Sequence, residues 1–228
     1  MIVSINQPAY LPWLGYFNRV ANSDLHIVLD HVQYEKNSFT NRNKIRTAQG
    51  FSWLTLPLKT KGRFGKLAIN TVEIADIPSW NRKHWDSLRF AYAKAPYFKD
   101  YMNWLETAYA KQWLLMGDVL NECNDWLYKC LGIDTPIVYS SDLGISTTKD
   151  RLIIDLCLKV EATTYLSGPL GRNYLKPKEF EAAGIELTYH DYQHPVYQQF
   201  QGGVFLPYMS TVDLLFNEGA ESERIVKR

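Results

Sequence analysis

Short apolar runs separated by helix-forming stretches are the feature that most constrains how this 228-residue chain can fold. Residues 2–5 predict a buried strand, the near-helical spacing of apolar residues over 11–22 predicts a helix, and residues 25–29 predict a second strand. Parallel neighbours need a long crossover, which a helix of this length supplies. The first thirty residues therefore predict a βαβ unit.

The same alternation returns in the second half of the chain. Apolar runs predict strands over 137–139, 163–166 and 185–189, and helical spacing predicts helices over 149–160, 178–183 and 210–218. Strands that alternate with helices indicate an α/β fold with a mostly parallel sheet and flanking helices.

The middle of the chain follows a different pattern. Residues 79–131 are helical in spacing, with a break at Ala95-Pro96 and Gly132 at the end. Before them we expect a basic loop over 34–49, a strand over 51–58, a mobile segment over 61–66 and a half-buried strand over 67–74. We expect one α/β domain over residues 1–228, with a helical insert at about 79–131.

Composition excludes several classes of protein. The 25 Lys and Arg nearly balance the 24 Asp and Glu, so nothing predicts a general attraction to nucleic acid. No run of eighteen apolar residues predicts a membrane span, and the N-terminus lacks a basic leader. The three cysteines have neither disulfide nor zinc spacing. We expect a cytoplasmic protein with inert core thiols and no metal.

Aromatic residues are unusually frequent, at 14% of the chain, and many stand beside polar residues. Rings with polar edges are good platforms for sugars and bases. A tyrosine-rich core with partly hydrated rings is the alternative interpretation.

The first candidate site lies where the first two predicted strands end. Gln7 follows the first strand, and Asp30 and Gln33 follow the second; in a parallel unit these loops open on one edge of the sheet. Asp30 is a candidate general base, hydroxyl acceptor or metal ligand, or else a turn residue. Tyr10 and Trp13 lie in a loop that two prolines stiffen, and they are candidate ligand contacts.

Cations and histidines supply further candidates. Arg42 and Lys44, with Asn41, form a cluster that suits a diphosphate, although a charged run is more often a solvated face. His84, His190 and His194 are candidate proton carriers or structural hydrogen-bonding groups.

Recognised catalytic motifs are absent from the sequence. There is no GxxxxGK[ST] loop, GxSxG elbow, GxGxxG fingerprint or paired CxxC. The run from Ser167 to Arg172 comes nearest to a phosphate-binding loop, and a glycine-rich turn is the alternative.

A series of short motifs nevertheless resembles one family across nearly the whole chain. They are QP at 7–8, YLPWLGYF at 10–17, DHVQ at 30–33, NRNKI at 41–45, APYF at 95–98, SGP at 167–169, YQQF at 197–200 and FLP at 205–207, followed by Ser210 and Asp213. Their order and spacing resemble the WbqC-like family. The resemblance implies an enzyme of bacterial surface-polysaccharide (O-antigen) biosynthesis that acts on a nucleotide-linked amino sugar.

With this resemblance, the expected reaction is transfer of an acyl or aminoacyl group from a thioester, on coenzyme A or an acyl carrier protein, to the sugar amine. Asp30 or His84 would accept the amine proton, and Arg42 or Gln7 would hold the oxyanion. No other cofactor is expected. The expected substrate-binding residues are Gln7, Tyr10, Trp13, Gln33, Asn41, Lys44, Ser167, Arg172, Tyr174, Tyr197 and Gln199.

Two alternatives stay open from the sequence. The strand, loop, helix and strand at the N-terminus are also typical of ATP-dependent nucleotidyltransferases and ligases, an analogy at the level of fold. A non-catalytic, sugar-binding assembly protein would use the same aromatic residues only to bind.

Overall fold

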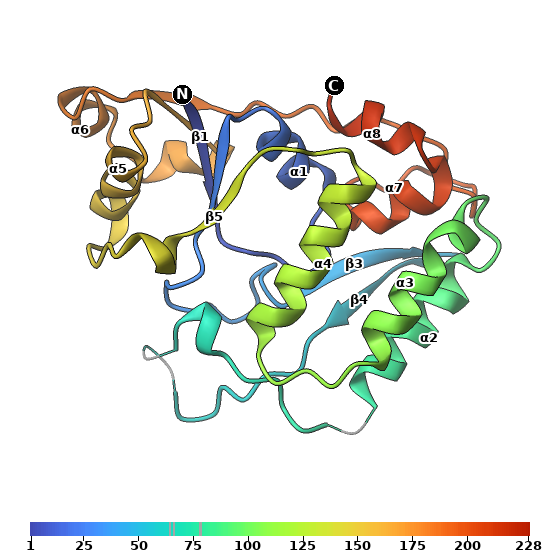
Figure 1. The fold of residues 1–228 in the computed structure, drawn as a ribbon. Helices are drawn as coiled ribbons and strands as arrows, with labels where there is room; N and C mark the ends of the chain where they lie inside the picture. The colour runs from blue at the N-terminus through green and yellow to red at the C-terminus, as the bar shows by residue number, and fades with distance from the viewer. Residues whose placement is uncertain (64, 66, 78) are drawn as a thin grey trace.

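Five short strands form one parallel sheet in the order β5-β2-β1-β6-β7, which confirms the predicted α/β fold. The computed structural model describes residues 1–63, 65, 67–77 and 79–228, and helices cover both faces of the sheet (Figure 1). The strands are β1 (Ile2–Asn6), β2 (Leu25–Val28), β5 (Ile137–Tyr139), β6 (Thr164–Ser167) and β7 (Glu186–Tyr189). All four neighbouring pairs are parallel.

The central strand, β1, has two different buried faces. Val3 and Ile5 pack in a core with Phe180 and the apolar face of α5 (Lys149–Lys159), and Phe180 belongs to α6 (Pro177–Ala182). Because side chains alternate along a strand, Ser4 and Asn6 point to the opposite face. That face is polar, and the Ser4 hydroxyl lies 2.8 Å from His26 Nδ1.

The opposite face is covered by α1 (Leu14–Ala21), and a second, larger core extends from there. This core includes side chains of the helical insert, α2 (Trp80–Tyr92), α3 (Phe98–Ala110) and α4 (Met116–Cys130), and of the C-terminal helices α7 (Thr211–Glu218) and α8 (Glu221–Val226). The predicted break at Ala95-Pro96 separates α2 from α3, and Gly132 follows α4 with a φ of 57°. Within the described residues, none of the helices combines the length and apolar character that a bilayer crossing requires.

The order of the strands creates a switch point beside β1. From β1 the chain runs outward through β2 and β5 on one side, and β6 and β7 then continue on the other side. In open parallel sheets the loops at such a point leave a crevice beyond the carboxyl ends of the strands. Here that crevice lies beyond β1 and β6.

The segment before the helical insert differs from its predicted structure in two places, and the first is the predicted loop over residues 34–49. Residues 34–49 are not a continuous loop, because β3 (Arg42–Thr47) pairs with β4 (Gly50–Thr55) in an antiparallel hairpin. Asn43 and Ile45 alternate as buried residues along β3, but the charged residues Arg42, Lys44 and Arg46, the last of which is also buried, obscure that pattern. The strand predicted over 51–58 ends at Thr55.

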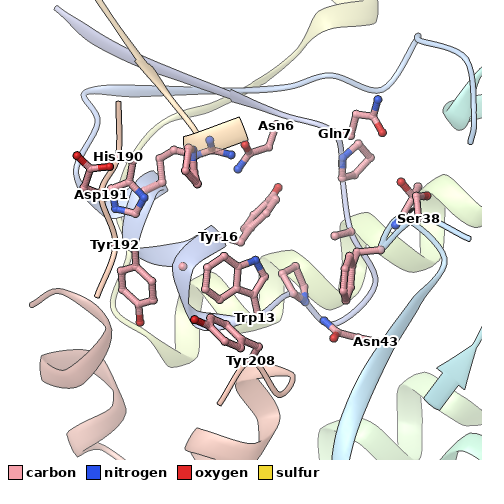
Figure 2. Close-up of a pocket in the computed structure, with 18 of the residues that line it drawn as sticks. Asn6, Gln7, Trp13, Tyr16, Ser38, Asn43, His190, Asp191, Tyr192 and Tyr208 are labelled. Atoms are coloured by element: carbon pink, nitrogen blue, oxygen red, sulfur yellow. Dashed lines mark hydrogen bonds between the residues drawn. The ribbon is translucent and has the colours of Figure 1, made fainter. Parts of the chain in front are cut away.

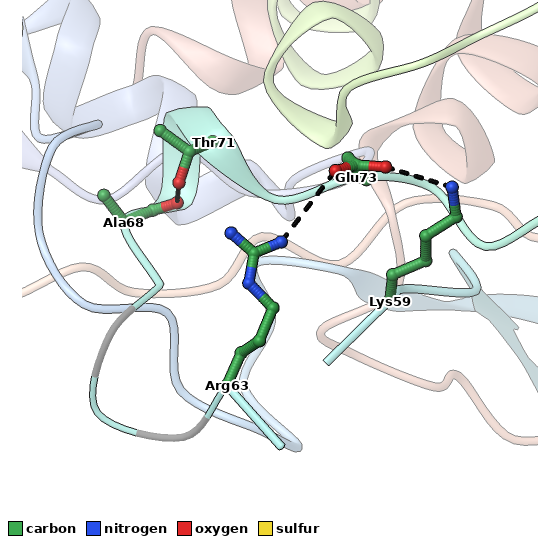
Figure 3. Close-up of polar contacts among 5 residues, drawn as sticks. All are labelled: Lys59, Arg63, Ala68, Thr71 and Glu73. Atoms are coloured by element: carbon green, nitrogen blue, oxygen red, sulfur yellow. Dashed lines mark hydrogen bonds and ion pairs between the residues drawn. The ribbon is translucent and has the colours of Figure 1, made fainter. Parts of the chain in front are cut away.

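Residues 67–74 do not form the predicted strand, because their backbone groups bond to unrelated segments. Ala68 bridges to Gln33 and Ile74 bridges to Leu58, so no continuous ladder can form. Between them lies a short 3-10 helix, η1 (Ile69–Thr71). Figure 3 shows Glu73 with two cations, Lys59 at 3.0 Å and Arg63 at 3.9 Å. Of the segment predicted to be mobile, Phe64 and Lys66 lie outside the described residues.

The cysteines are free thiols within the helical layers. Cys123 and Cys157 are buried, as predicted for core thiols, whereas Cys130 is partly exposed. Burial raises the pKa of both buried thiols to about 12 and that of Cys130 to about 11. Because the thiolate is the reactive form, all three have low reactivity at neutral pH.

A buried carboxylate joins the C-terminal helix to the rest of the molecule. Asp213 of α7 accepts hydrogen bonds from the hydroxyls of Tyr92, at 2.8 Å, and Tyr197, at 2.6 Å, and from the Gln199 amide at 2.8 Å. Burial raises the pKa of the Asp213 carboxyl, and these three hydrogen bonds oppose that rise. The carboxylate therefore holds α2, α7 and the segment that follows β7 in one arrangement.

Replacing this carboxylate tests its role in stability. We expect Asp213→Ala to lower the free energy of unfolding by at least about 3 kcal/mol, because it removes the acceptor of three buried hydrogen bonds and leaves the Tyr92 and Tyr197 hydroxyls without one. Urea denaturation followed by circular dichroism measures the change. Asp134→Ala, at an exposed aspartate, is the control and should stay within about 0.5 kcal/mol. A loss below about 1 kcal/mol for Asp213→Ala would contradict this role.

Candidate functional site

A cavity of about 750 Å³ lies at the switch point of the sheet. This volume falls within the usual range for small-molecule sites. Its lining residues come from five separate segments: Asn6, Gln7, Pro8, Ala9, Pro12, Trp13, Gly15, Tyr16, Arg19, Ser38, Phe39, Thr40, Asn43, Pro169, His190, Asp191, Tyr192, Gln193 and Tyr208.

The carboxyl ends of three adjacent strands form the floor. Asn6 ends β1 and Gln7 follows it, Pro169 comes shortly after β6, and His190 directly follows β7. The His190 backbone N–H donates to the Ser167 carbonyl over 2.8 Å, which keeps the ends of β6 and β7 together. The parallel sheet thus brings residues far apart in sequence to one cavity.

The loop before β3 forms the opposite wall. Asn43 reaches from β3 and donates its side-chain amide to the Leu11 carbonyl over 2.6 Å. Leu11 has a φ of 44°, a left-handed conformation that is rare for a branched residue. The Tyr10 backbone N–H also donates to the Phe39 carbonyl over 3.3 Å. These bonds fix the stiff loop after β1 against the hairpin.

Aromatic rings gather around Trp13. Its indole makes edge-on contacts with Tyr192, at a centroid distance of 5.4 Å, and with Tyr208 at 5.5 Å. Figure 2 shows Trp13 between Tyr192 on one side of the cavity and Asn43 on the other. Gly15 is required there, because a Cβ at this position would lie 2.3 Å from the indole. The cavity thus offers ring faces and edges on which a base or sugar can pack.

His190 is the histidine that lines the cavity. Its Nε2 lies 2.5 Å from Asn18 Oδ1, and the Asn18 amide donates to the Val226 carbonyl, so Oδ1 is the acceptor and Nε2 carries the proton. Burial, followed by the positive charge of Arg19, lowers the pKa of His190. A neutral ring with Nε2 protonated leaves Nδ1 as a proton acceptor.

Of the residues predicted from the sequence, Gln7, Trp13 and the candidate proton carrier His190 line the cavity, and Asp30 does not. The Asp30 carboxylate accepts hydrogen bonds from the hydroxyls of Ser140, at 2.9 Å, and Ser141, at 2.7 Å. Gln33 donates to the Tyr34 carbonyl over 2.8 Å and accepts from the backbone N–H of Leu67 over 3.0 Å. Both residues follow β2, as predicted, but they join it to neighbouring segments.

His84 and Tyr10 are buried together away from the cavity. The Tyr10 hydroxyl lies 2.9 Å from His84 Nδ1 and also contacts the hydroxyl of Tyr109. Tyr10 has no exposed surface, and His84 is 8% exposed. Burial lowers the pKa of His84 to about 4, so its ring is neutral at physiological pH.

The predicted cation cluster lies on the hairpin. Arg42 donates to the Asn37 carbonyl over 2.7 Å, and its guanidinium lies 4.5 Å from the centroid of the Trp53 ring. The Lys44 ammonium lies 4.6 Å from the Phe51 ring. Asn41 is buried and donates to the Leu56 carbonyl over 3.0 Å. These groups stand beside the cavity wall and outside its lining.

The remaining predicted residues lie either at and after the end of β6 or beside Asp213. Ser167 is buried at the end of β6, and Arg172 pairs with Asp191 at 3.0 Å. Tyr174 is exposed on the surface. Tyr197 and Gln199 both bind the Asp213 carboxylate.

Sequence analysis missed most of the cavity lining. Asn6 directly precedes the predicted Gln7, Tyr16 belongs to the motif at 10–17, and Asn43 lies between Arg42 and Lys44, so proximity in the sequence was a usable signal. Arg19 lies near the end of a helix, where a cation is usually solvated, and nothing in the sequence marks it. Among the residues described, no group of three His, Cys, Asp or Glu side chains is arranged as metal ligands.

Comparison with known proteins gives two matches. The profile of the WbqC-like protein family matches residues 7–225. The uncharacterized protein Rv1507c of Mycobacterium tuberculosis (strain ATCC 25618 / H37Rv) is 37% identical over 222 residues, which cover 96% of this chain and 95% of that protein. No solved structure matches the chain.

The electrostatics of the cavity can be tested on His190. We expect its imidazole to titrate below the ordinary value of 6.5, because burial and the Arg19 charge both disfavour the imidazolium form. We expect Arg19→Met to raise this pKa, because it removes the neighbouring positive charge. NMR titration of the histidine Cε1–H signals, assigned with His190→Gln, measures both values. A wild-type pKa of 6.5 or above would contradict the arrangement.

Proposed function

Because this chain belongs to the WbqC-like protein family, we propose that it is an enzyme that transfers an acyl or aminoacyl group to the amine of a nucleotide-linked sugar. The observation that carries the proposal is the cavity at the switch point, which combines aromatic rings with a neutral histidine. Ligands of parallel α/β sheets bind in this position. A nucleotide-linked sugar needs both a ring platform and polar partners.

The proposed reaction needs no covalent enzyme intermediate. The sugar amine attacks the carbonyl carbon of a thioester, a C–N bond forms, and the C–S bond breaks as the thiolate leaves. Nδ1 of His190 accepts the proton that the amine loses, and the resulting imidazolium can protonate the thiolate. Side-chain amides such as that of Gln7 are suited to hold the oxyanion of the tetrahedral intermediate.

His190 suits the role of base better than Asp30 or His84, the two residues expected from the sequence to accept the amine proton. The Asp30 carboxylate is engaged by Ser140 and Ser141, and His84 is buried against Tyr10. Neither lines the cavity, whereas His190 does and keeps one ring nitrogen unprotonated. The position of a candidate base matters before its pKa, since the base must lie within reach of the proton that it removes.

The proposed setting is the synthesis of bacterial surface polysaccharide, including O-antigen, in the cytoplasm. Coenzyme A or an acyl carrier protein would bring the acyl group as a thioester. This setting comes from the resemblance to the family, and the cavity is compatible with such a substrate in size.

Nucleotidyl transfer from ATP is the second candidate function. The observation that favours it is the same sheet topology, because nucleotides also bind at the switch points of parallel sheets. The two proposals differ in what is consumed: a thioester in the first and a nucleoside triphosphate in the second.

A ligand screen followed by an activity assay tests the proposal. We expect nucleotide-linked sugars with a free amine to raise the melting temperature more than matched sugars without one, because a ligand of the folded state stabilises it. With a stabilising sugar and an acyl thioester, thiol release should be measurable. We expect His190→Gln to reduce kcat roughly 10²-fold or more, the usual contribution of a general base.

Variants outside the cavity supply the controls. His31→Gln should retain activity, since His31 bonds to Ser140 and does not line the cavity. Full activity of His190→Gln, with loss of activity in a folded Asp30→Asn or His84→Gln variant, would instead favour Asp30 or His84 as the base, as the sequence predicted. ATP consumption without any thioester reaction would replace acyl transfer with nucleotidyl transfer.

A further inference from the structure

Arg19 lines the cavity, and no charged partner for it is present in the part of the chain that the structure describes. Among the described residues, its guanidinium makes no ion pair and no hydrogen bond, and its Nε is buried without an acceptor. Burial lowers the pKa of the guanidinium, whereas the neighbouring phenols of Tyr165, Tyr16 and Tyr174 oppose that change. No carboxylate is among these neighbours.

A second unpartnered donor faces the same cavity. Asn6 is only 7% exposed, yet its side-chain Nδ2 is buried without an acceptor. The alternation along β1 places Asn6 on the face covered by α1, which carries Arg19. Figure 2 shows the Asn6 side chain at the edge of the cavity nearest to Tyr16. Both unpartnered groups are donors, so both call for an acceptor.

The chain keeps space open for the guanidinium. A Cβ at Gly168 would lie 2.2 Å from a terminal nitrogen of Arg19. Gly168 has a φ of −68°, which any residue can adopt, so the backbone does not require glycine there. The missing side chain therefore serves to admit Arg19 beside the end of β6.

None of the carboxylates that the structure describes neutralises this charge. Asp191 also lines the cavity, but it pairs with Arg172 at 3.0 Å. A buried, unpaired cation lowers stability, and buried polar groups normally find partners. A ligand that brings negative charge and several acceptor oxygens would satisfy Arg19 and Asn6 together. A guanidinium suits phosphate in particular, because its planar donors match two phosphate oxygens.

We propose that Arg19 and Asn6, in the space left by Gly168, form a subsite for a phosphate group. That the phosphate belongs to the diphosphate of a nucleotide-linked sugar rests on the proposed function. The subsite itself does not, because it follows from the unpartnered donors. It places the diphosphate against the ends of β1 and β6, with the aromatic rings around Trp13 available to the rest of the ligand.

Binding of inorganic pyrophosphate to the full chain tests the subsite directly. We expect isothermal titration calorimetry at fixed ionic strength to detect binding, and Arg19→Met to weaken it at least tenfold. Arg224→Met is the matched control, because Arg224 is exposed and pairs with Glu221 at 2.7 Å. The control should bind pyrophosphate as the wild type does. Equal binding by Arg19→Met, or none by the wild type at 10 mM, would overturn the subsite.

Thermal stability separates a ligand-binding role from a structural one. Without pyrophosphate, we expect Arg19→Met to melt at or above the wild-type temperature, because it removes a buried charge that has no partner. Pyrophosphate should raise the melting temperature of the wild type and not of the variant. A marked fall in melting temperature for Arg19→Met would mean that the arginine is structural, which would overturn the proposal.

A second variant displaces the guanidinium without removing it. Gly168→Ala should weaken pyrophosphate binding, whereas Gly117→Ala, whose Cβ would lie 3.6 Å from its nearest neighbour, should not. Malonate serves as the carboxylate probe. Tighter binding of malonate than of pyrophosphate would overturn the assignment to phosphate.

The outcomes separate this proposal from the proposed function. Pyrophosphate binding that depends on Arg19, in a protein that transfers no acyl group to any amino sugar, supports the subsite and contradicts the function. Acyl transfer with an unchanged KM for the nucleotide-linked sugar in Arg19→Met, together with unchanged pyrophosphate binding, supports the function and overturns the subsite.

Discussion

The buried carboxylate of Asp213 is the interaction on which the arrangement of the cavity depends. Its three donors come from α2 and from the segment after β7, so one group orients three parts of the chain. The start of α7 is thereby held beside the hairpin and the first loop: Ser210 N–H donates to the Lys44 carbonyl over 2.8 Å, and Thr211 N–H to Pro12 over 2.9 Å. Because Pro12 precedes Trp13, this carboxylate indirectly positions the aromatic part of the cavity.

Buried polar groups in this molecule fall into two sets that differ in how they are partnered. Asp30 and Asp213 accept several hydrogen bonds, and His84 has a tyrosine partner, so these groups hold segments together. Asn6 is buried and Arg19 is partly buried, but each carries a buried donor atom without an acceptor, and both line the cavity. Since unpaired buried groups reduce stability, their retention at a single cavity is the physical argument for a ligand there.

The sequence predicted those helices and strands whose signals come from residues close together in the chain. The strands of the parallel sheet, the α1 crossover and the break at Ala95-Pro96 were predicted correctly, because periodicity and proline act within a few residues. The hairpin strand Arg42–Thr47 was missed because its buried positions include an asparagine and its intervening residues are charged. The strand predicted over 67–74 failed because its alternation met no continuous partner.

The sequence alone determined the α/β class, the strand ends at which Gln7 and Asp30 lie, and the stiff loop that carries Trp13. Only the tertiary structure decided which of these residues face the cavity, and whether each buried group has a partner. It turned Asp30 toward Ser140 and left Arg19 beside Gly168, although the members of each pair are far apart in the sequence. The reason is physical: element type depends on neighbours in sequence, whereas burial and pairing depend on contacts between segments that only the fold brings together.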